Sequence, residues 1–258
     1  MLNFSSNELN TLITGFLWPL TRILGLIAVA PLFSNGSVPR RTKVGLGILL
    51  AMIVAPLVQV PAGLEPMSMQ GLLILVQQML IGIAMGFSMR IIFSAVEMAG
   101  ELSSMTMGLG FATFFDPQSR GRSNAVSQFL GLLVLMLYLA ANVHLALLST
   151  LVDSFTTMPI TAGPLTGNIA EQVVRWGARL FSAGLQLSLP IVAALLITNV
   201  ALGILTRAAP SLNLFGIGFP ITLAIGFTMV GLILPYMTTP ILNLFEETIT
   251  TIRQLTGG

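Results

Sequence analysis

The feature that most constrains this fold is a long apolar segment from about Met69 to about Met107, which stays compatible with a helix throughout. At about 1.5 Å per residue, its roughly 40 residues would form a helix of about 60 Å, about twice the thickness of the hydrocarbon core of a bilayer. Such a helix must tilt strongly, break, or extend beyond the lipid.

Composition places the chain among integral membrane proteins. It has 258 residues, of which 55% are hydrophobic and 8% are charged, whereas soluble domains carry about 25% charged residues. Its 11 basic and 9 acidic residues form no basic patch suited to nucleic acid. With no cysteine and one histidine, disulfides, thiolate sites and a His-rich metal site are excluded for this chain alone, and we expect no cofactor. The N-terminus lacks the basic region of a signal peptide, and we expect it to be retained.

The apolar runs and their breaks predict an all-α integral membrane protein of about six long, partly kinked helices. Turn residues, glycines and prolines separate the runs and are typical of helix ends. The predicted helices cover about 9–33, 44–60, 69–107, 125–151, 169–205 and 214–245, with Pro190 in the fifth and Pro220, Pro235 and Pro240 in the sixth. Gly82 and Gly86 permit a close helix approach, and Trp176 fits an interfacial anchor.

Basic residues near short connections predict the orientation of the chain in the membrane. Six lie in the connections after the first, third and fifth predicted helices: Arg40, Arg41, Lys43, Arg120, Arg122 and Arg207. Three lie on the opposite side: Arg175, Arg179 and Arg253. We therefore expect the connections after the first, third and fifth helices to face the cytoplasm and both termini to face outward.

The stretch from Glu101 to Asn124 joins two predicted helices but is no ordinary polar loop. Glycines weaken a helix interior and a proline disfavours helical geometry before it, so Gly108, Gly110, Asp116 and Pro117 predict a non-helical conformation. The other residues of note are apolar: Met105, Met107, Leu109, Phe111, Phe114 and Phe115. Non-helical backbone at membrane depth must be buried in protein or line a water-filled space. The stretch is thus either a buried re-entrant element or a stopper in a pore.

The methionines and phenylalanines of this stretch allow two interpretations. They could be ordinary core residues, the commoner fate of aromatic side chains. They could also form a deformable apolar seal, because methionine fills irregular gaps and an apolar constriction can close a pore by excluding water. The neighbouring glycines favour the seal.

A polar stripe follows one face of the third predicted helix. Its residues recur at helical spacing: Arg90, Ser94, Glu97, Glu101 and Ser104, followed by Gly108. Exposing a carboxylate to lipid has a high free-energy cost, so the stripe faces water or protein. Either the glutamates pair with Arg90 or another arginine inside a packed bundle, or the stripe lines a conduit or a seam between subunits. We favour the seam.

Two further classes of function compete with a channel component. An ion-coupled small-solute transporter would use Glu97 and Glu101 and would show inverted repeats, which are not evident. A membrane enzyme would use Asp116 or His144, but the sequence has no paired acid and base, nucleophile elbow, phosphate loop or zinc motif, and we expect no enzyme.

Three stretches carry a specific family pattern: APLFSNGSVPRRTKVGLGILLA (30–51), EMAGELSSMTMGLGFATFFDPQSRGRSN (97–124) and PIVAALLITNVALGILTRAAPSLNLFGIGFPI (190–221). They resemble the R subunit of the flagellar type III protein export gate, the FliR family, which is homologous to the R and T subunits of injectisome export apparatus. The resemblance covers essentially the whole chain.

The resemblance implies a hetero-oligomer. One R subunit would join several P and Q subunits in a closed channel for unfolded flagellar proteins, near the B-type switch component and the A-type export component of the same apparatus. It also implies a single membrane domain (1–258), with a P-like portion over about 1–168 and a Q-like helical hairpin and tail over about 169–258. The location would be the bacterial inner membrane in the flagellar basal body, with helices raised toward the periplasm.

The resemblance further assigns roles to residues of this chain. The central plug loop corresponds to about 105–122, with Phe111, Phe114 and Phe115 in an apolar gasket. The hairpin tip near the cytoplasm corresponds to the turn that contains Arg207, Pro210 and Asn213.

Overall fold

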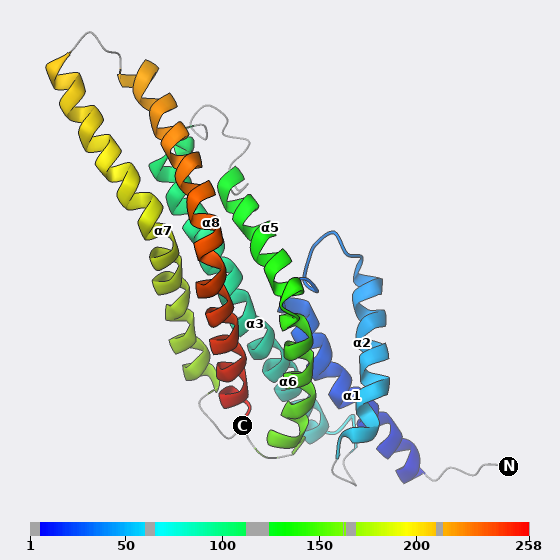
Figure 1. Cartoon of the computed structure of the whole chain (residues 1–258). Coiled ribbons are helices and arrows are strands. Elements are labelled where there is room, and N and C mark those ends of the chain that lie inside the picture. The colour runs from blue at the N-terminus through cyan, green and yellow to red at the C-terminus, as the bar shows by residue number, and fades with distance from the viewer. Residues whose placement is uncertain are drawn as a thin grey trace. The chain divides into compact units, whose positions relative to one another are not determined.

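The computed structural model describes residues 6–59, 65–111, 124–161, 163, 169–209 and 214–257. Within these ranges the regular structure is helical, without a strand, which confirms the predicted all-α class. The α-helices follow in this order (Figure 1): α1 (Ser6–Val29), α2 (Arg40–Val54), α3 (Met69–Thr106), α5 (Ala125–Ala140), α6 (Val143–Thr157), α7 (Ile169–Ala208) and α8 (Leu214–Leu255). Short 3-10 turns follow α2 and α3, at Ala55–Leu57 and Leu109–Phe111.

Among the described residues, three stretches of helix are long and apolar enough to cross a membrane. They are Met69–Thr106, Ile169–Ala208 and Gly218–Leu255, and the bent pair α5 and α6 gives a fourth if it is counted as one span. The overlong third helix is confirmed, because α3 runs unbroken for 38 residues. The helices α7 and α8 continue through the internal prolines that the sequence placed in them.

The predicted fourth helix, 125–151, is wrong as a single helix. The chain breaks at Asn142, which has a left-handed φ of 55°, so that α5 ends and α6 begins beside it. Asparagine tolerates this conformation better than most residues, because its short polar side chain can bond locally. The break carries neither glycine nor proline, so the usual markers of a helix end are missing.

The contacts divide the chain into two compact units. The first comprises Met1–Ile91, Asn142–Gly177 and Phe245–Gly258, and the second Ile92–Ala141 and Ala178–Leu244. The helices α3, α7 and α8 each contribute residues to both units.

In the first unit, α1 crosses the beginning of α3 at very close range. A Cβ at Gly82 would overlap the carbonyl group of Arg22, and one at Gly25 would lie 2.6 Å from the carbonyl oxygen of Met79. A Cβ at Gly86 would likewise lie 2.9 Å from a backbone oxygen of α1. The close approach predicted from Gly82 and Gly86 is therefore confirmed.

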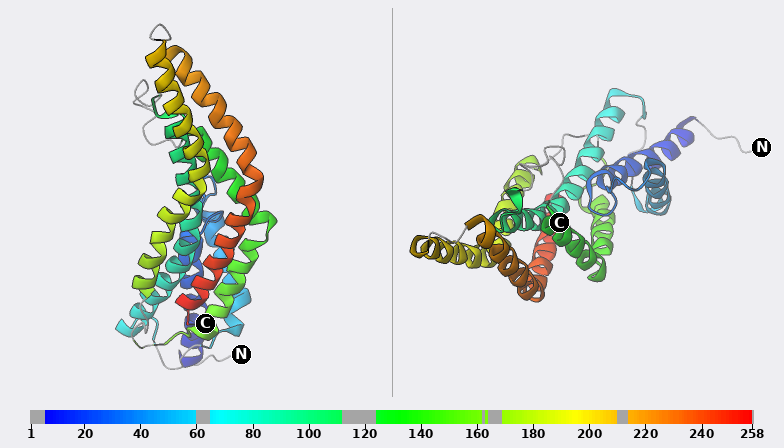
Figure 2. Two further views of the ribbon diagram at one scale, coloured as in Figure 1. Left: turned by 60° about the vertical axis from the view of Figure 1, so that its left-hand side comes forward. Right: turned by 90° about the horizontal axis from the view of Figure 1, so that it is seen from above.

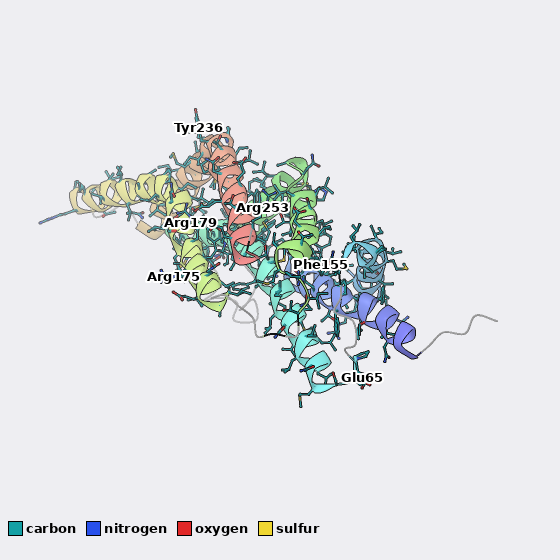
Figure 3. The ribbon with its side chains drawn as sticks, turned by 90° about the horizontal axis from the view of Figure 1, so that it is seen from below. Glu65, Phe155, Arg175, Arg179, Tyr236 and Arg253 are labelled. Carbon is teal, nitrogen blue, oxygen red and sulfur yellow. The ribbon has the colours of Figure 1, made fainter. Side chains whose placement is uncertain are left out.

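Arg22 forms the polar centre of this unit and is 0% exposed. Its Nε donates to Oε1 of Gln78 (2.7 Å), Nη1 to the carbonyl oxygen (2.8 Å) and Oγ (3.0 Å) of Ser154, and Nη2 to the carbonyl oxygen of Met158 (2.9 Å). The guanidinium carbon lies 4.2 Å from the ring centre of Phe155, which projects from α6 (Figure 3). The cation thus sits at the C-terminal end of α6, where the helix dipole favours positive charge.

Trp176 belongs to the same unit and is only 9% exposed. Its Nε1 donates to the carbonyl oxygen of Ser88 on α3 at 3.1 Å. Because the indole is buried and bonded within the unit, Trp176 packs α7 against α3. It is not the interfacial anchor that the sequence predicted.

In the second unit, the end of α3 packs closely on α5 and α7. A Cβ at Gly100 would lie 2.5 Å from the Cα of Ser127, and one at Gly184 would lie 3.0 Å from the carbonyl oxygen of Ala95. Within this unit α7 and α8 run as antiparallel neighbours in both orientations of the ribbon (Figures 1 and 2). The end of α3 therefore packs against α5, the next α-helix along the chain, and against α7, which is distant in sequence.

Candidate functional site

The site lies where the chain leaves α3. After Thr106 the backbone turns at Gly108, whose φ is 91° and whose N–H bonds to the carbonyl oxygen of Met105 at 3.1 Å. A residue with a side chain rarely adopts this φ, so the turn requires glycine. A Cβ at Gly110 would instead meet open space. The two glycines of the stretch therefore differ, because the observed geometry requires only Gly108.

The two methionines of the site differ in exposure. Met105 is 61% exposed, whereas Met107 is 0% exposed. Met107 lies against α8, where a Cβ at Gly226 would overlap its Cγ and lie 2.8 Å from its Cε and Sδ. Thr222 Oγ1 donates to the carbonyl oxygen of Met107 at 3.2 Å. The beginning of the segment after α3 is therefore fixed to α8.

The segment also returns to α3. Asn124, directly before α5, donates from Nδ2 to Oε1 of Glu101 at 2.8 Å. One turn further, Ser127 Oγ donates to the carbonyl oxygen of Glu97 at 2.8 Å. Both ends of the intervening chain are therefore held on the second unit.

The polar stripe on α3 changes its surroundings along its length. In the first unit, Arg90 is exposed and its Nη1 donates to Ser34 Oγ at 3.3 Å. In the second unit the exposure falls toward the helix end: Glu97 is exposed, Ser94 and Glu101 are half-buried, and Ser104 is fully buried. The hydroxyl of Ser104 has no hydrogen-bond partner among the described residues. The stripe is thus not one continuous exposed surface.

Neither glutamate of the stripe forms an ion pair within the described part of the chain. One ion pair of that part joins Arg175 to Glu171 at 2.7 Å, on α7, where Figure 3 shows Arg175 and Arg179. Over the same ranges, no group of three or more His, Cys, Asp or Glu side chains could hold a metal ion. The glutamates instead lie along α5, with Glu101 bonded to Asn124.

Several predicted site residues lie outside the described part. They are Phe114, Phe115, Asp116, Pro117, Pro210 and Asn213, together with the side chain of Phe111. Leu109 and Gly110 are half-buried, and Arg207 is exposed in the last turn of α7.

Sequence reasoning missed the residues that hold the two ends of the segment. Thr222 lies 115 positions after Met107, so no local pattern connects them. Gly226 carried a signal, because a glycine inside a helix costs stability and often marks a close approach. Gly231 is also a glycine inside α8, but a Cβ added there would meet open space. A glycine in the helix therefore does not by itself show where another segment packs closely.

The comparisons with known proteins match nearly the whole chain. The family model of bacterial export proteins, family 1, matches residues 13–248. The flagellar biosynthetic protein FliR of Pectobacterium carotovorum subsp. carotovorum is 43% identical over 96% of this chain and 94% of that protein. FliR of Escherichia coli (strain K12) is 42% identical over the same shares, and FliR of Bacillus subtilis (strain 168) is 30% identical over 96% of this chain and 97% of that protein. The chain therefore belongs to the FliR family and is a component of the flagellar type III export apparatus.

Proposed function

We propose that this export component is a non-enzymatic part of a closed protein-conducting channel, and that its segment 105–122 is the plug. In this proposal one copy assembles with P and Q subunits, and unfolded flagellar proteins pass through the assembly. The observation that carries the proposal is the two-point attachment of this segment: Met107 is held on α8 and Asn124 on α3. Both ends of the segment are thus fixed on helices of the second unit.

The apolar surface of the hairpin formed by α7 and α8 supports assembly with other subunits. Large apolar side chains of α7 are exposed at Phe181, Leu185, Leu189, Ile197 and Val200. In the most apolar 18-residue stretch of α7, only 17% of the residues are buried within the chain. Lipid or partner helices must cover such a face. We assign residues 169–258 to the Q-like hairpin and 1–168 to the P-like portion, and place the B-type switch component near the tip at Arg207, Pro210 and Asn213. The A-type export component is a further partner in the same apparatus.

The apolar helices and the family place this chain in a membrane. We assign it to the inner membrane within the flagellar basal body, with helices raised toward the periplasm. In that position the polar stripe on α3 would lie against neighbouring subunits. The exposed carboxylate of Glu97 is available for such a contact.

The gasket is tested by replacing Phe111, Phe114 and Phe115 together with alanine. The expected result is a leak of ions and small molecules through the assembled complex, because the apolar constriction that excludes water is widened. Permeability is measured in cells after copurification with the P and Q subunits has shown assembly. Phe129→Ala is the matched control, since Phe129 is an exposed phenylalanine of α5 outside the plug.

Unchanged permeability in the triple variant would remove the gasket from the proposal.

The competing transporter hypothesis is tested with the purified chain alone in vesicles. Ion-driven solute uptake by that preparation, abolished by Glu97→Gln or Glu101→Gln, would support the transporter and contradict the channel.

A further inference from the structure

We propose that a groove between α5 and α8 binds one acyl chain of a membrane phospholipid. The groove has a volume of about 450 Å³. Its lining comes from Val96 of α3, from residues of α5 between 130 and 140, and from residues of α8 between 234 and 241, all of which belong to the second unit. The proposal does not involve the segment 105–122.

The groove has a buried base and an open mouth. Val96, Leu130 and Val134 line it and are almost completely buried. Leu133 and Met136, on the same helix α5, also line it but are exposed. The groove therefore opens on the surface of the chain, and a ligand can enter it from the side.

The lining selects an apolar ligand. Among the described residues that line the groove, every one except Thr238 has an apolar side chain and none is charged. A polar ligand needs several polar groups to orient it, and a cavity with so few polar groups does not hold ordered water. A hydrocarbon chain, in contrast, supplies the van der Waals contacts that an empty groove would lack.

The dimensions of the groove fit an acyl chain and exclude a whole helix. From Leu130 to Ala140, α5 rises by about 15 Å, which is half of the hydrocarbon core of about 30 Å and thus the reach of an acyl chain in one leaflet. An α-helix with its side chains is about 10–12 Å across, so a helical segment of this length occupies more than about 1,000 Å³. The groove has less than half of that volume.

The groove lies where the chain is apolar enough to cross a membrane. Its α8 wall lies within the candidate span Gly218–Leu255, and its α5 wall lies within the bent pair of α5 and α6. These walls run side by side in the same direction in both orientations of the ribbon (Figures 1 and 2). In a membrane, the acyl chains of phospholipids are therefore the apolar molecules that reach the mouth.

Two residues of the walls account for the space between them. Pro235 lines the groove and lies inside α8, where a proline donates no N–H to the preceding turn and bends the helix. Ala140 ends α5 on the opposite wall and has the shortest side chain of the lining. A bent helix facing a short side chain leaves room that an unbranched hydrocarbon chain can fill.

The first test measures the phospholipid that the full chain retains after purification from membranes in a mild detergent. Native mass spectrometry should show one phospholipid per chain, without preference for a zwitterionic or an anionic headgroup, because the lining offers no charge. Thr238→Phe extends an aromatic ring into the groove and should lower this occupancy at least fivefold. Thr239→Phe is the matched control and should keep the lipid, since Thr239 is also exposed but does not line the groove.

Absence of retained phospholipid from the wild type, or equal retention by Thr238→Phe, would overturn the proposal. Retention of a free fatty acid in place of a phospholipid would overturn it as well. Ala140→Phe fills the groove from the α5 wall and should lower the occupancy in the same way. It provides the same comparison if Thr238→Phe reduces the yield of folded chain.

The second test identifies the occupant in the complete export complex. The chain has no cysteine, so a benzophenone label on Met136→Cys attaches to this one residue of it. Illumination should give an adduct with the mass of a phospholipid, and Thr238→Phe should lower its yield at least threefold. The yield from Leu132→Cys, at an exposed residue of α5 outside the groove, should not change, which separates a lipid in the groove from the surrounding bilayer. An adduct of Met136→Cys with another subunit in place of lipid would show that protein covers the groove and would overturn the proposal.

Discussion

Asn124 donates a hydrogen bond of 2.8 Å from Nδ2 to Oε1 of Glu101, and this bond ties the residue before α5 to the last turns of α3. Asn124 holds the position before α5 from which a side chain usually caps the helix. Its side chain makes no such bond and reaches α3 instead. Asn124 therefore holds the start of α5 on α3 at the expense of a helix cap.

Glu101→Ala removes the acceptor and should lower the free energy of unfolding by about 1.5 kcal/mol, the contribution of a hydrogen bond to a charged group. Glu101→Gln keeps an acceptor oxygen and should recover most of this loss. The measurement is the protease resistance of the solubilised complex, which falls when the start of α5 separates from α3. Equal resistance of the alanine variant and the wild type would show that the bond holds nothing.

Charge reversal separates the two glutamates of the stripe. Glu101→Lys places a cation beside the Asn124 amide donor and should impair both folding and export. Glu97 is exposed in this chain, so Glu97→Lys should leave the isolated chain intact and impair only assembly with the other subunits. Copurification compared with the yield of the chain alone distinguishes the effects. If both lysine variants assemble and export normally, the polar stripe is incidental.

The long apolar helices could be predicted from the sequence because each depends on its own composition. The segment 69–107 is apolar over its whole length and forms α3 almost to the residue. The break at Asn142 could not be predicted, because its neighbours are alanine and valine and its left-handed φ arises without a glycine. Local pattern thus determines where a helix can form, but not where packing interrupts it.

The site was predictable only in part for a similar reason. Gly108 and Gly110 both indicated a weak point of the helix, because this is a property of single residues, but only Gly108 has the positive φ of a turn. The different fates of Met105 and Met107 depend on Gly226, which is remote in sequence. No periodicity of α3 alone distinguishes an exposed methionine from one that fills a notch in another helix.

Gly82→Ala should destabilise the first unit. The new Cβ would overlap the carbonyl group of Arg22 and lie 2.9 Å from the backbone nitrogen of Leu26, so α1 and α3 must separate. Overpacking of this kind costs about 1–3 kcal/mol. Gly15→Ala is the matched control, because Gly15 lies in α1 with nothing within 4 Å and should gain up to about 1 kcal/mol of helix stability. Thermal unfolding midpoints should therefore shift in opposite directions, and a shared direction would contradict the close crossing.

Asn142→Gly should be tolerated and Asn142→Val should not. The φ of 55° at this position is open to glycine, whereas left-handed geometry costs other residues roughly 1–2 kcal/mol. A branched side chain would favour continuing the helix from α5 into α6. Circular dichroism and protease resistance measure the outcome. Equal stability of the glycine and valine variants would show that the break does not depend on the residue.

Arg22 should be the least replaceable side chain of the first unit. It satisfies oxygens of Gln78, Ser154 and Met158 with three different nitrogens. Arg22→Met removes all of these donors at once. Breaking a buried network of this kind costs about 3 kcal/mol or more, so the solubilised chain should unfold at a clearly lower temperature.

Arg22→Lys separates the contribution of the positive charge to stability from that of the guanidinium geometry. Lysine keeps the cation at the end of α6 but lacks the planar fork that reaches Gln78 and both backbone oxygens together. We expect it to lose roughly half of the stability that Arg22→Met loses, because the favourable interaction of the charge with the helix end remains. Arg41→Met, at an exposed arginine of α2, is the control and should stay within about 0.5 kcal/mol of the wild type. If Arg22→Lys is as stable as the wild type, the charge alone holds α6 and the planar guanidinium is dispensable. If Arg22→Met is also as stable as the wild type, the hydrogen bonds of Arg22 do not hold α1, α3 and α6 together.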